Sequence, residues 1–443
     1  MNATLCEPAR VASRNGWVAR CAAWAGNPGL LSVMDQALVS GTSFVTTLLI
    51  GRTCSRETLG LFALAISLIA LARAIQEQLV SAPYLVYAGR DRGRTLATYT
   101  GHCLLQHAAL SVGAMLAFGG LWIALAAGWG PSGLLPAMPV LTVALPFVLL
   151  REHVRQTAYG QLEPRAAVAV DAIAAAVQLG LIGLLAWHGW LNLIAIYACM
   201  GLACAVAAGG WLYARRTAIG FQAEALWTDT RRNWVLGRWA LACHLVGQLA
   251  PFVMPWLLAL SHDEGAAGLL AACVTLSGPA GMLLAGYANY LTPRLSHLYA
   301  NEGPRGLWAM LVRSAGVFTV GLGLFCALAW IWGDELGALA YGERYAGGGP
   351  VFALLATVVL VNSFGVLAGN GLWAMELARA NFRADVLTML ATVGTAACAI
   401  GPYGPAGCAV SILVGTTAGA SLRVAILIGA LREAKAAVGS ARA

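Results

Sequence analysis

Two stretches of the chain, 30–51 and 58–88, combine strong hydrophobicity with polar side chains that recur every three or four residues. The first carries Ser32, Asp35, Gln36, Ser40, Ser43 and Thr47, and the second carries Arg73, Gln76, Glu77, Ser81 and Tyr84. On an α-helix this spacing gathers side chains on one face. We therefore expect two polar stripes on neighbouring helices, which together line a hydrophilic cavity through Asp35, Gln36, Arg73, Gln76 and Glu77.

Arg73 is the side chain best suited to bind a charged ligand. It lies about fifteen residues from the outer end of its stretch, roughly 22 Å at 1.5 Å per residue. A charge at such depth costs about 2.5–3.5 kcal/mol on insertion scales. Two interpretations stay open: the guanidinium binds an anionic head group, since it matches phosphate in geometry, or it forms a structural ion pair with Glu77 or Asp35.

The second half of the sequence offers fewer candidates. His244 and Gln248 share one helical face and would line a cavity there, unless His244 is a hydrogen-bonded packing residue. Arg423, near the inner third of the last stretch, is a further candidate ligand or a side chain that snorkels to the membrane surface. We interpret the remaining charges as interfacial groups and ion pairs at helix ends: Arg151, Glu152, Arg155, Asp171, Glu376, Arg379, Arg383 and Asp385.

The composition shows what kind of element must position these residues. The chain is 59% hydrophobic and 10% charged, whereas soluble domains carry about 25% charged residues. Lipid must therefore replace water around most of the surface. Stretches long enough to cross a bilayer predict an all-α polytopic membrane protein with about twelve helices, at 30–51, 58–88, 97–127, 134–151, 166–188, 190–213, 238–261, 265–297, 307–332, 350–376, 383–401 and 404–430.

The basic residues predict the orientation of these helices. With the N-terminus inside, the inward segments hold 22 of the 27 basic residues, the outward segments hold three, and two lie within spans. Lys and Arg collect in cytoplasmic loops, so we expect both termini in the cytoplasm and a multi-pass protein of the bacterial inner membrane. The same distribution argues against nucleic acid as the partner of the basic residues.

The chain divides into two halves of six helices each. We expect a cytoplasmic segment at 1–29, an N-lobe at 30–213, a linker at 214–237, a C-lobe at 238–430 and a cytoplasmic tail at 431–443. The segment 1–29 and the linker are either interfacial helices or ordinary basic loops with tryptophans at the membrane boundary. A faint parallel repeat supports the division. Gly60-Leu61 and Pro83 in the second span correspond to Gly268-Leu269 and Pro293 in the eighth.

Motifs for covalent chemistry and metal binding are absent from the sequence. The eleven cysteines form no CxxC pair, no Walker A or HExxH motif occurs, and GxSxG lacks a suitable context. We expect no catalytic residues, no metal and no cofactor, and a protein that is not an enzyme.

Residues 35–44 (DQALVSGTSF) and 60–65 (GLFALA) resemble the start of bacterial polysaccharide-export flippases. The run 81–84 (SAPY) and the arginine-rich stretch 150–171 are also similar to that family. The flippases belong to the multidrug/oligosaccharidyl-lipid/polysaccharide (MOP) exporter superfamily, and the similarity in length and span number extends over nearly the whole chain. The resemblance implies a MATE/MOP-like fold, in which two helical lobes surround a central cavity and alternate between inward- and outward-facing states.

The resemblance also implies a cargo. Such flippases move an oligosaccharide on an undecaprenyl pyrophosphate carrier from the cytoplasmic to the periplasmic leaflet, with membrane lipids around them, H⁺ or Na⁺ as candidate coupling ions and other polysaccharide-export proteins as candidate partners. One alternative is a cation-coupled multidrug or solute exporter of the same superfamily. An alternative from another class is a membrane-embedded glycan polymerase or glycosyltransferase, against which the short outward loops argue.

Overall fold

The computed structural model describes residues 28–89 and 94–440, and within them it contains helices and no strand. The interfacial helix expected in 1–29 lies outside the described residues, apart from the last two positions of that segment.

The first half of the chain forms six antiparallel passes. The second pass continues from α3 through a π-helical turn, η1, into α4, which begins next to Pro83. Short 3₁₀ turns precede the fourth pass and follow the sixth. The elements are α2 (Pro28–Thr53), α3 (Arg56–Gln76), η1 (Glu77–Ser81), α4 (Ala82–Tyr87), α5 (Arg94–Ala126), η2 (Ser132–Ala137), α6 (Met138–Gly160), α7 (Pro164–Trp187), α8 (Leu193–Arg215) and η3 (Arg216–Ala218).

The second half contains fewer and longer helices: α9 (Ala223–Ser261), α10 (Glu264–Tyr341), the 3₁₀ turn η4 (Glu343–Tyr345), α11 (Gly349–Ala374) and α12 (Ala378–Ser440). Glycine breaks two of them. Gly303 in α10 and Gly404 in α12 have φ of 65° and 53°, a region that glycine enters without steric cost. Each break therefore divides one long helix, α10 or α12, into two passes.

The number of helical passes agrees with the number of hydrophobic stretches in the sequence. Nine helices of the described chain are long and apolar enough to cross a membrane, and the bent helix α9 supplies a tenth. At 78 and 63 residues, α10 and α12 are each long enough for two crossings. Divided at their glycines, they bring the passes to the twelve that the hydrophobic stretches predict.

Helix α9 differs from the expected linker followed by a separate span. It runs from Ala223 without interruption through the predicted boundary at residue 237, and it bends by 49° at Gln248. Pro251 explains the bend, because proline lacks the N–H that would bond to the carbonyl three to four residues earlier and its ring crowds that turn. The interfacial segment and the seventh pass are thus one kinked helix.

The first part of α9 packs against α5 through buried polar contacts. His102 lies with Nδ1 2.6 Å from a carboxylate oxygen of Asp229 and Nε2 2.8 Å from the backbone oxygen of Gln222. The Tyr99 hydroxyl donates to Oδ1 of Asn233 at 2.7 Å. The opposite face carries the exposed Trp227, Trp234 and Trp239, which suits a helix at the headgroup layer.

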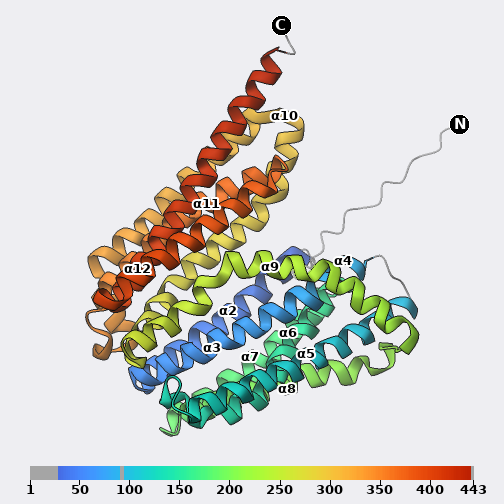
Figure 1. Cartoon of the computed structure of the whole chain (residues 1–443), viewed down its shortest axis with the longest axis vertical. Helices are drawn as coiled ribbons and strands as arrows, with labels where there is room; N and C mark the ends of the chain where they lie inside the picture. The colour runs from blue at the N-terminus through green and yellow to red at the C-terminus, as the bar shows by residue number, and fades with distance from the viewer. Residues whose placement is uncertain (1–27, 90–93, 441–443) are drawn as a thin grey trace, which may run out of the picture.

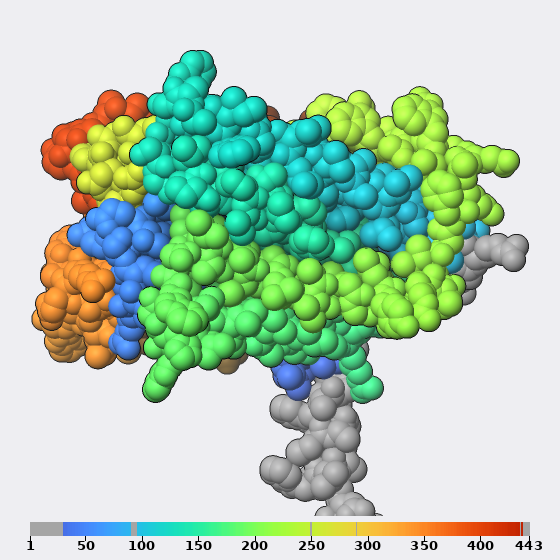
Figure 2. All heavy atoms as spheres, turned by 90° about the horizontal axis from the view of Figure 1, so that it is seen from below, coloured from blue at the N-terminus to red at the C-terminus, as the bar shows by residue number. Residues whose placement is uncertain are grey.

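The two halves diverge towards one end of the molecule. The C-terminal end of α12 and the turn within α10 lie far from α4 and from the start of α5, whereas the helices approach one another at the opposite end (Figure 1). We call the diverging end, where α2 begins and α12 finishes, the terminal end, and the opposite one the distal end. Seen from below, blue residues of α2 and α3 lie between orange residues of the second half and green residues of the first (Figure 2).

A reciprocal glycine contact closes the distal end. A Cβ placed on Gly60 of α3 would lie 1.7 Å from the carbonyl oxygen of Glu264, and one on Gly268 of α10 would lie 2.1 Å from that of Arg56. Gly60 thus faces Glu264, four residues before Gly268, and Gly268 faces Arg56, four residues before Gly60. This reciprocity is what a two-fold relation between halves produces, and it places in contact the two glycines that mark the sequence repeat.

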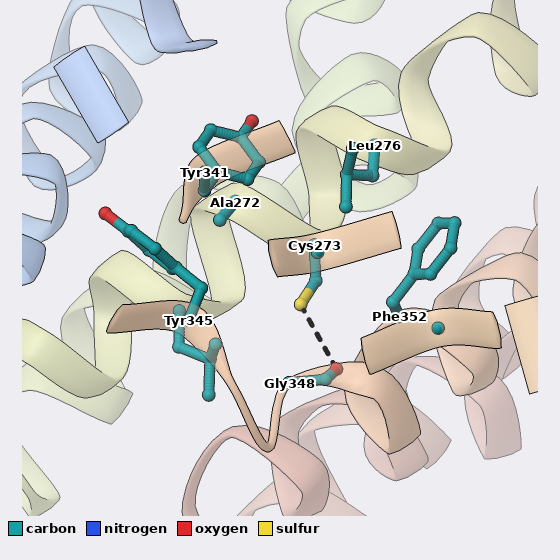
Figure 3. A pocket seen from close by; sticks show the side chains of 10 residues that line it. Ala272, Cys273, Leu276, Tyr341, Tyr345, Gly348 and Phe352 are labelled. Atoms are coloured by element: carbon teal, nitrogen blue, oxygen red, sulfur yellow. Dashed lines mark hydrogen bonds between the residues drawn. The ribbon is translucent and has the colours of Figure 1, made fainter. Parts of the chain in front are cut away.

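Arginine side chains add hydrogen bonds across the same closure. Arg52 at the end of α2 donates from Nε to the carbonyl oxygen of Ala340 at 2.5 Å, and Arg344 donates to that of Cys54 at 3.0 Å. Nearby, Cys273 donates to the oxygen of Gly348 (Figure 3). The packing there leaves a cavity of only about 10 Å³, so side chains fill the distal end almost completely.

We predict that Gly268→Val destabilises the protein, because any added side chain must push α10 away from α3. Overpacking of a close contact costs about 1–3 kcal/mol. Thermal unfolding of the purified protein in detergent measures the loss. Gly278→Val is the matched control in the same helix, since a Cβ there meets no atom within 4 Å. Equal losses in both variants would contradict the closure.

Candidate functional site

Helix α2 carries two separate polar faces. Asp35, Thr42 and Thr46 are buried, and Gln178 of α7 donates to Thr46 at 3.0 Å. Ser32, Gln36 and Ser43 are exposed, with Ser40 and Thr47 half-buried on the same side. At 100° per residue these two sets are about a quarter turn apart. The single stripe expected from the sequence is therefore divided, and Asp35 does not line an open cavity but faces the helices of the first half.

Asp35 belongs to a buried cluster of charges in the first half. Its oxygen Oδ2 accepts from Nη1 of Arg155 at 3.0 Å and from the Tyr159 hydroxyl at 2.8 Å, both on α6. The same guanidinium reaches Glu152 Oε1 at 3.2 Å and Asp171 Oδ2 on α7 at 3.8 Å. Asp35 and Asp171 are 1% exposed and Glu152 is 2% exposed.

These charges lie in one layer because of their positions along their helices. Asp35 and Asp171 each come seven residues after their helix begins, and Glu152 comes eight before α6 ends. At 1.5 Å per residue all three carboxylates are roughly 10–12 Å from the terminal end. Arg151 adds contacts of 3.8 Å to Glu152 and 3.5 Å to Asp171. The layer joins α2, α6 and α7.

Arg73 stands at the edge of this cluster and differs from its other arginines in exposure. Its Nη1 lies 3.9 Å from Glu152 Oε2, which is an ionic contact but too long for a hydrogen bond. Its side chain is 43% exposed, against 15% and 13% for Arg151 and Arg155. The structural partner is thus Glu152 rather than Glu77 or Asp35, and one side of the guanidinium remains open.

The other two candidates on the second pass lie differently. Gln76 is 1% exposed and donates to Ser81 Oγ at 3.1 Å, so it does not line an open cavity. Glu77 is half-buried at the first position of the π-helical turn η1. π-helical turns within α-helices are frequent at functional sites, and this one packs against Gly237 of α9.

A second polar site joins the two passes of α12 in the other half. Arg423 forms an ion pair with Asp385, and Gly365 and Gly369 of α11 leave room for the arginine side chain. Asn381 donates to the carbonyl oxygen of Gly369 at 3.0 Å. Arg423 is therefore held inside the half rather than at the membrane surface.

Helix α9 meets this site at its bend. A Cβ on Gly247 would lie 3.9 Å from the carboxyl carbon of Asp385. Gln248, the bent residue, is exposed, and His244 one turn earlier is half-buried. Gln248 therefore remains a candidate lining residue.

Sequence reasoning missed the charged cluster on α6 and α7. The sequence predicts Arg151, Glu152, Arg155 and Asp171 to be interfacial charges and ion pairs at helix ends, with the fourth span ending at residue 151. The ion pairs are present, but they form one cluster with Asp35 inside the first half. The helix continues to Gly160. The spacing of Glu152 and Arg155 at i and i+3 is the signal that was available, since it places the arginine beside the carboxylate, with Arg151 one turn before Arg155.

The fold is shared with transporters of the MOP superfamily. An inward-facing multidrug resistance MATE transporter superposes with a TM-score of 0.76 over 90% of this chain and 95% of its own, at 12% identity. The lipid II flippase MurJ, in an inward closed conformation, gives 0.72 over 89% and 86%, also at 12% identity. The sequence matches no protein-family model and no curated protein.

An outward-facing MATE transporter gives a TM-score of 0.62 over 92% of this chain and 95% of its own at 12% identity. At such low identity the likeness shows the fold alone.

We predict that Arg423 and Asp385 are energetically coupled. Arg423→Met and Asp385→Asn each leave a partly buried charge without its partner, whereas the double variant removes both. The double variant should lose about 0.5–3 kcal/mol less stability than the sum of the singles. Chemical or thermal unfolding of the four proteins measures this coupling. Pairing Arg423→Met with Glu376→Gln, an exposed carboxylate at the α11–α12 turn, is the control and should be additive; additivity in both pairs would disprove the coupling.

Proposed function

We propose that the chain is a flippase that moves a lipid-linked oligosaccharide across the bacterial inner membrane by alternating access. The observation that carries the proposal is the open side of Arg73, a guanidinium near the middle of a membrane helix with one long ionic contact. A guanidinium binds phosphate with charge-assisted hydrogen bonds. A pyrophosphate carrier such as undecaprenyl pyrophosphate offers that ligand.

The polar face of α2 supports the same proposal. Ser32, Gln36 and Ser43 are exposed although α2 contacts both halves. Polar residues that faced lipid would cost free energy that no hydrogen bond offsets. In a hydrated space between the halves they can form hydrogen bonds with water or with sugar hydroxyls. Hydrogen bonding to an oligosaccharide needs this kind of surface, and hydrocarbon alone cannot shield such a head group.

The direction of transport follows from the basic loops. We infer that the terminal end faces the cytoplasm, because the inward segments carry most of the arginines. The cargo would then enter from the cytoplasmic leaflet, with its lipid tail left in the bilayer, and leave after the distal closure at Gly60 and Gly268 has opened. MurJ, a lipid II flippase with this fold, supports the compatibility of the fold with such a cargo. Other polysaccharide-export proteins would supply and remove it.

A cation-coupled exporter of drugs or other solutes is the second candidate. The three buried carboxylates of the first half favour it, because coupling to H⁺ or Na⁺ requires acidic groups inside the membrane. The transporter that superposes with a TM-score of 0.76 is itself a multidrug resistance MATE transporter. The transporter fold argues against the third alternative, a membrane-embedded glycan polymerase or glycosyltransferase.

We predict that Arg73→Ala slows flipping of a lipid-linked oligosaccharide in liposomes by about tenfold or more, since loss of a charge-assisted hydrogen bond costs about 1.5–3 kcal/mol. Arg73→Lys keeps the charge and should retain part of the rate. The readout is exposure of the glycan to an enzyme or lectin added outside.

Arg379→Ala, at an exposed arginine in the first turn of α12, is the control and should flip normally. A normal rate for Arg73→Ala would remove Arg73 from the cargo site. No flipping of several lipid-linked glycans by the wild type, together with ion-driven export of a dye, would favour the second candidate.

A further inference from the structure

The carboxylates buried in the described residues all meet at one guanidinium. Asp35, Glu152 and Asp171 come from α2, α6 and α7, and Arg155 contacts each of them with a different nitrogen, at 3.0, 3.2 and 3.8 Å. An arginine normally pairs with one or two carboxylates. Here a single side chain holds three helices together.

The three carboxylates alone would form a site for a small cation. Hard cations are bound by several carboxylate oxygens brought together from different parts of a chain. In addition, Asp35 Oδ1, Glu152 Oε2 and both oxygens of Asp171 are buried and accept no hydrogen bond. The cluster therefore has more acceptor oxygens than its guanidinium donors satisfy.

Charge balance decides what occupies this site. Arg151 and Arg73 make the remaining ionic contacts, to Glu152 and Asp171, so three guanidiniums face three carboxylates. A metal ion added to this neutral, buried cluster would bring an uncompensated charge, whose desolvation costs several kcal/mol. Loss of Arg155 would instead leave one negative charge in excess.

We infer that Arg155 is a tethered cation that occupies the centre of a three-carboxylate site, in the place that a monovalent metal ion such as Na⁺ would take. The site does not bind Na⁺ in the wild-type protein and becomes a Na⁺ site when Arg155 is removed. Its carboxylates therefore supply no Na⁺ coupling to transport. The inference goes beyond the proposed cargo, because it concerns ion binding by the protein alone.

The test is thermal unfolding of the purified protein in NaCl and in choline chloride at equal ionic strength. Wild type should unfold at the same temperature in both salts. Arg155→Ala should unfold at a lower temperature than wild type in choline chloride. Its unfolding temperature should rise by about 2–4 °C in NaCl and level off as the Na⁺ concentration increases, as expected when a ligand binds only the folded state. Guanidinium at low millimolar concentration should restore it too, because the free ion replaces the lost group.

Two variants separate this effect from general salt effects. Arg155→Ala combined with Asp171→Asn restores neutrality and should show no Na⁺ dependence. Arg155→Lys keeps the charge, so its unfolding temperature should also be independent of Na⁺. If Arg155→Ala does not fold, Arg155→Lys replaces it in the test. A Na⁺-specific stabilisation of the wild type or of Arg155→Lys would overturn the inference, as would an Arg155→Ala protein that is equally unstable in every salt. Neither result depends on whether the protein flips lipids.

Discussion

Three carboxylates are buried inside the first half and must be neutralised by nearby cations. Carboxylates at 1–2% exposure inside a helical bundle persist as charged groups only when cations face them. Arg155, Arg151 and Arg73 provide three such cations, from two helices, for acids on three helices. The arrangement therefore determines how α2, α3, α6 and α7 pack. It also leaves Arg73, the least buried of the three, as the one whose guanidinium still has an open side.

The closed distal end and the diverging terminal end follow from a different kind of contact. At the distal end, glycine permits the backbones of α3 and α10 to touch, and Arg52 and Arg344 bond to backbone carbonyls of the other half. Backbone carbonyls are present whatever the side chains, so such bonds can break and re-form as the halves rotate. A closure made of close backbone contacts would suit the alternating access proposed above.

The sequence predicts the helices well because hydrophobic length is a local property. All twelve passes were expected, including the two in α10 and the two in α12. The helix of the fourth span continues beyond the expected end at residue 151 to Gly160. Partners on α3 and α7 neutralise Glu152 and Arg151, and partners distant in sequence cannot be predicted from the sequence of one helix. Asp35 and Gln76, two of the residues expected to line a cavity, are buried, whereas the side chains of Gln36 and Arg73 are exposed. A role of any of these residues in binding a cargo stays a prediction.

The central claim is that Arg73 is available to an anionic cargo while Arg155 remains bound to its carboxylates. A structure of the protein with a short-chain polyprenyl pyrophosphate saccharide, determined in a lipid nanodisc, tests this most directly. We expect the pyrophosphate to lie between the halves within hydrogen-bond distance of Arg73, with Arg155 still in contact with Asp35, Glu152 and Asp171. A pyrophosphate bound elsewhere, or bound by Arg155 after it has left its carboxylates, would contradict it.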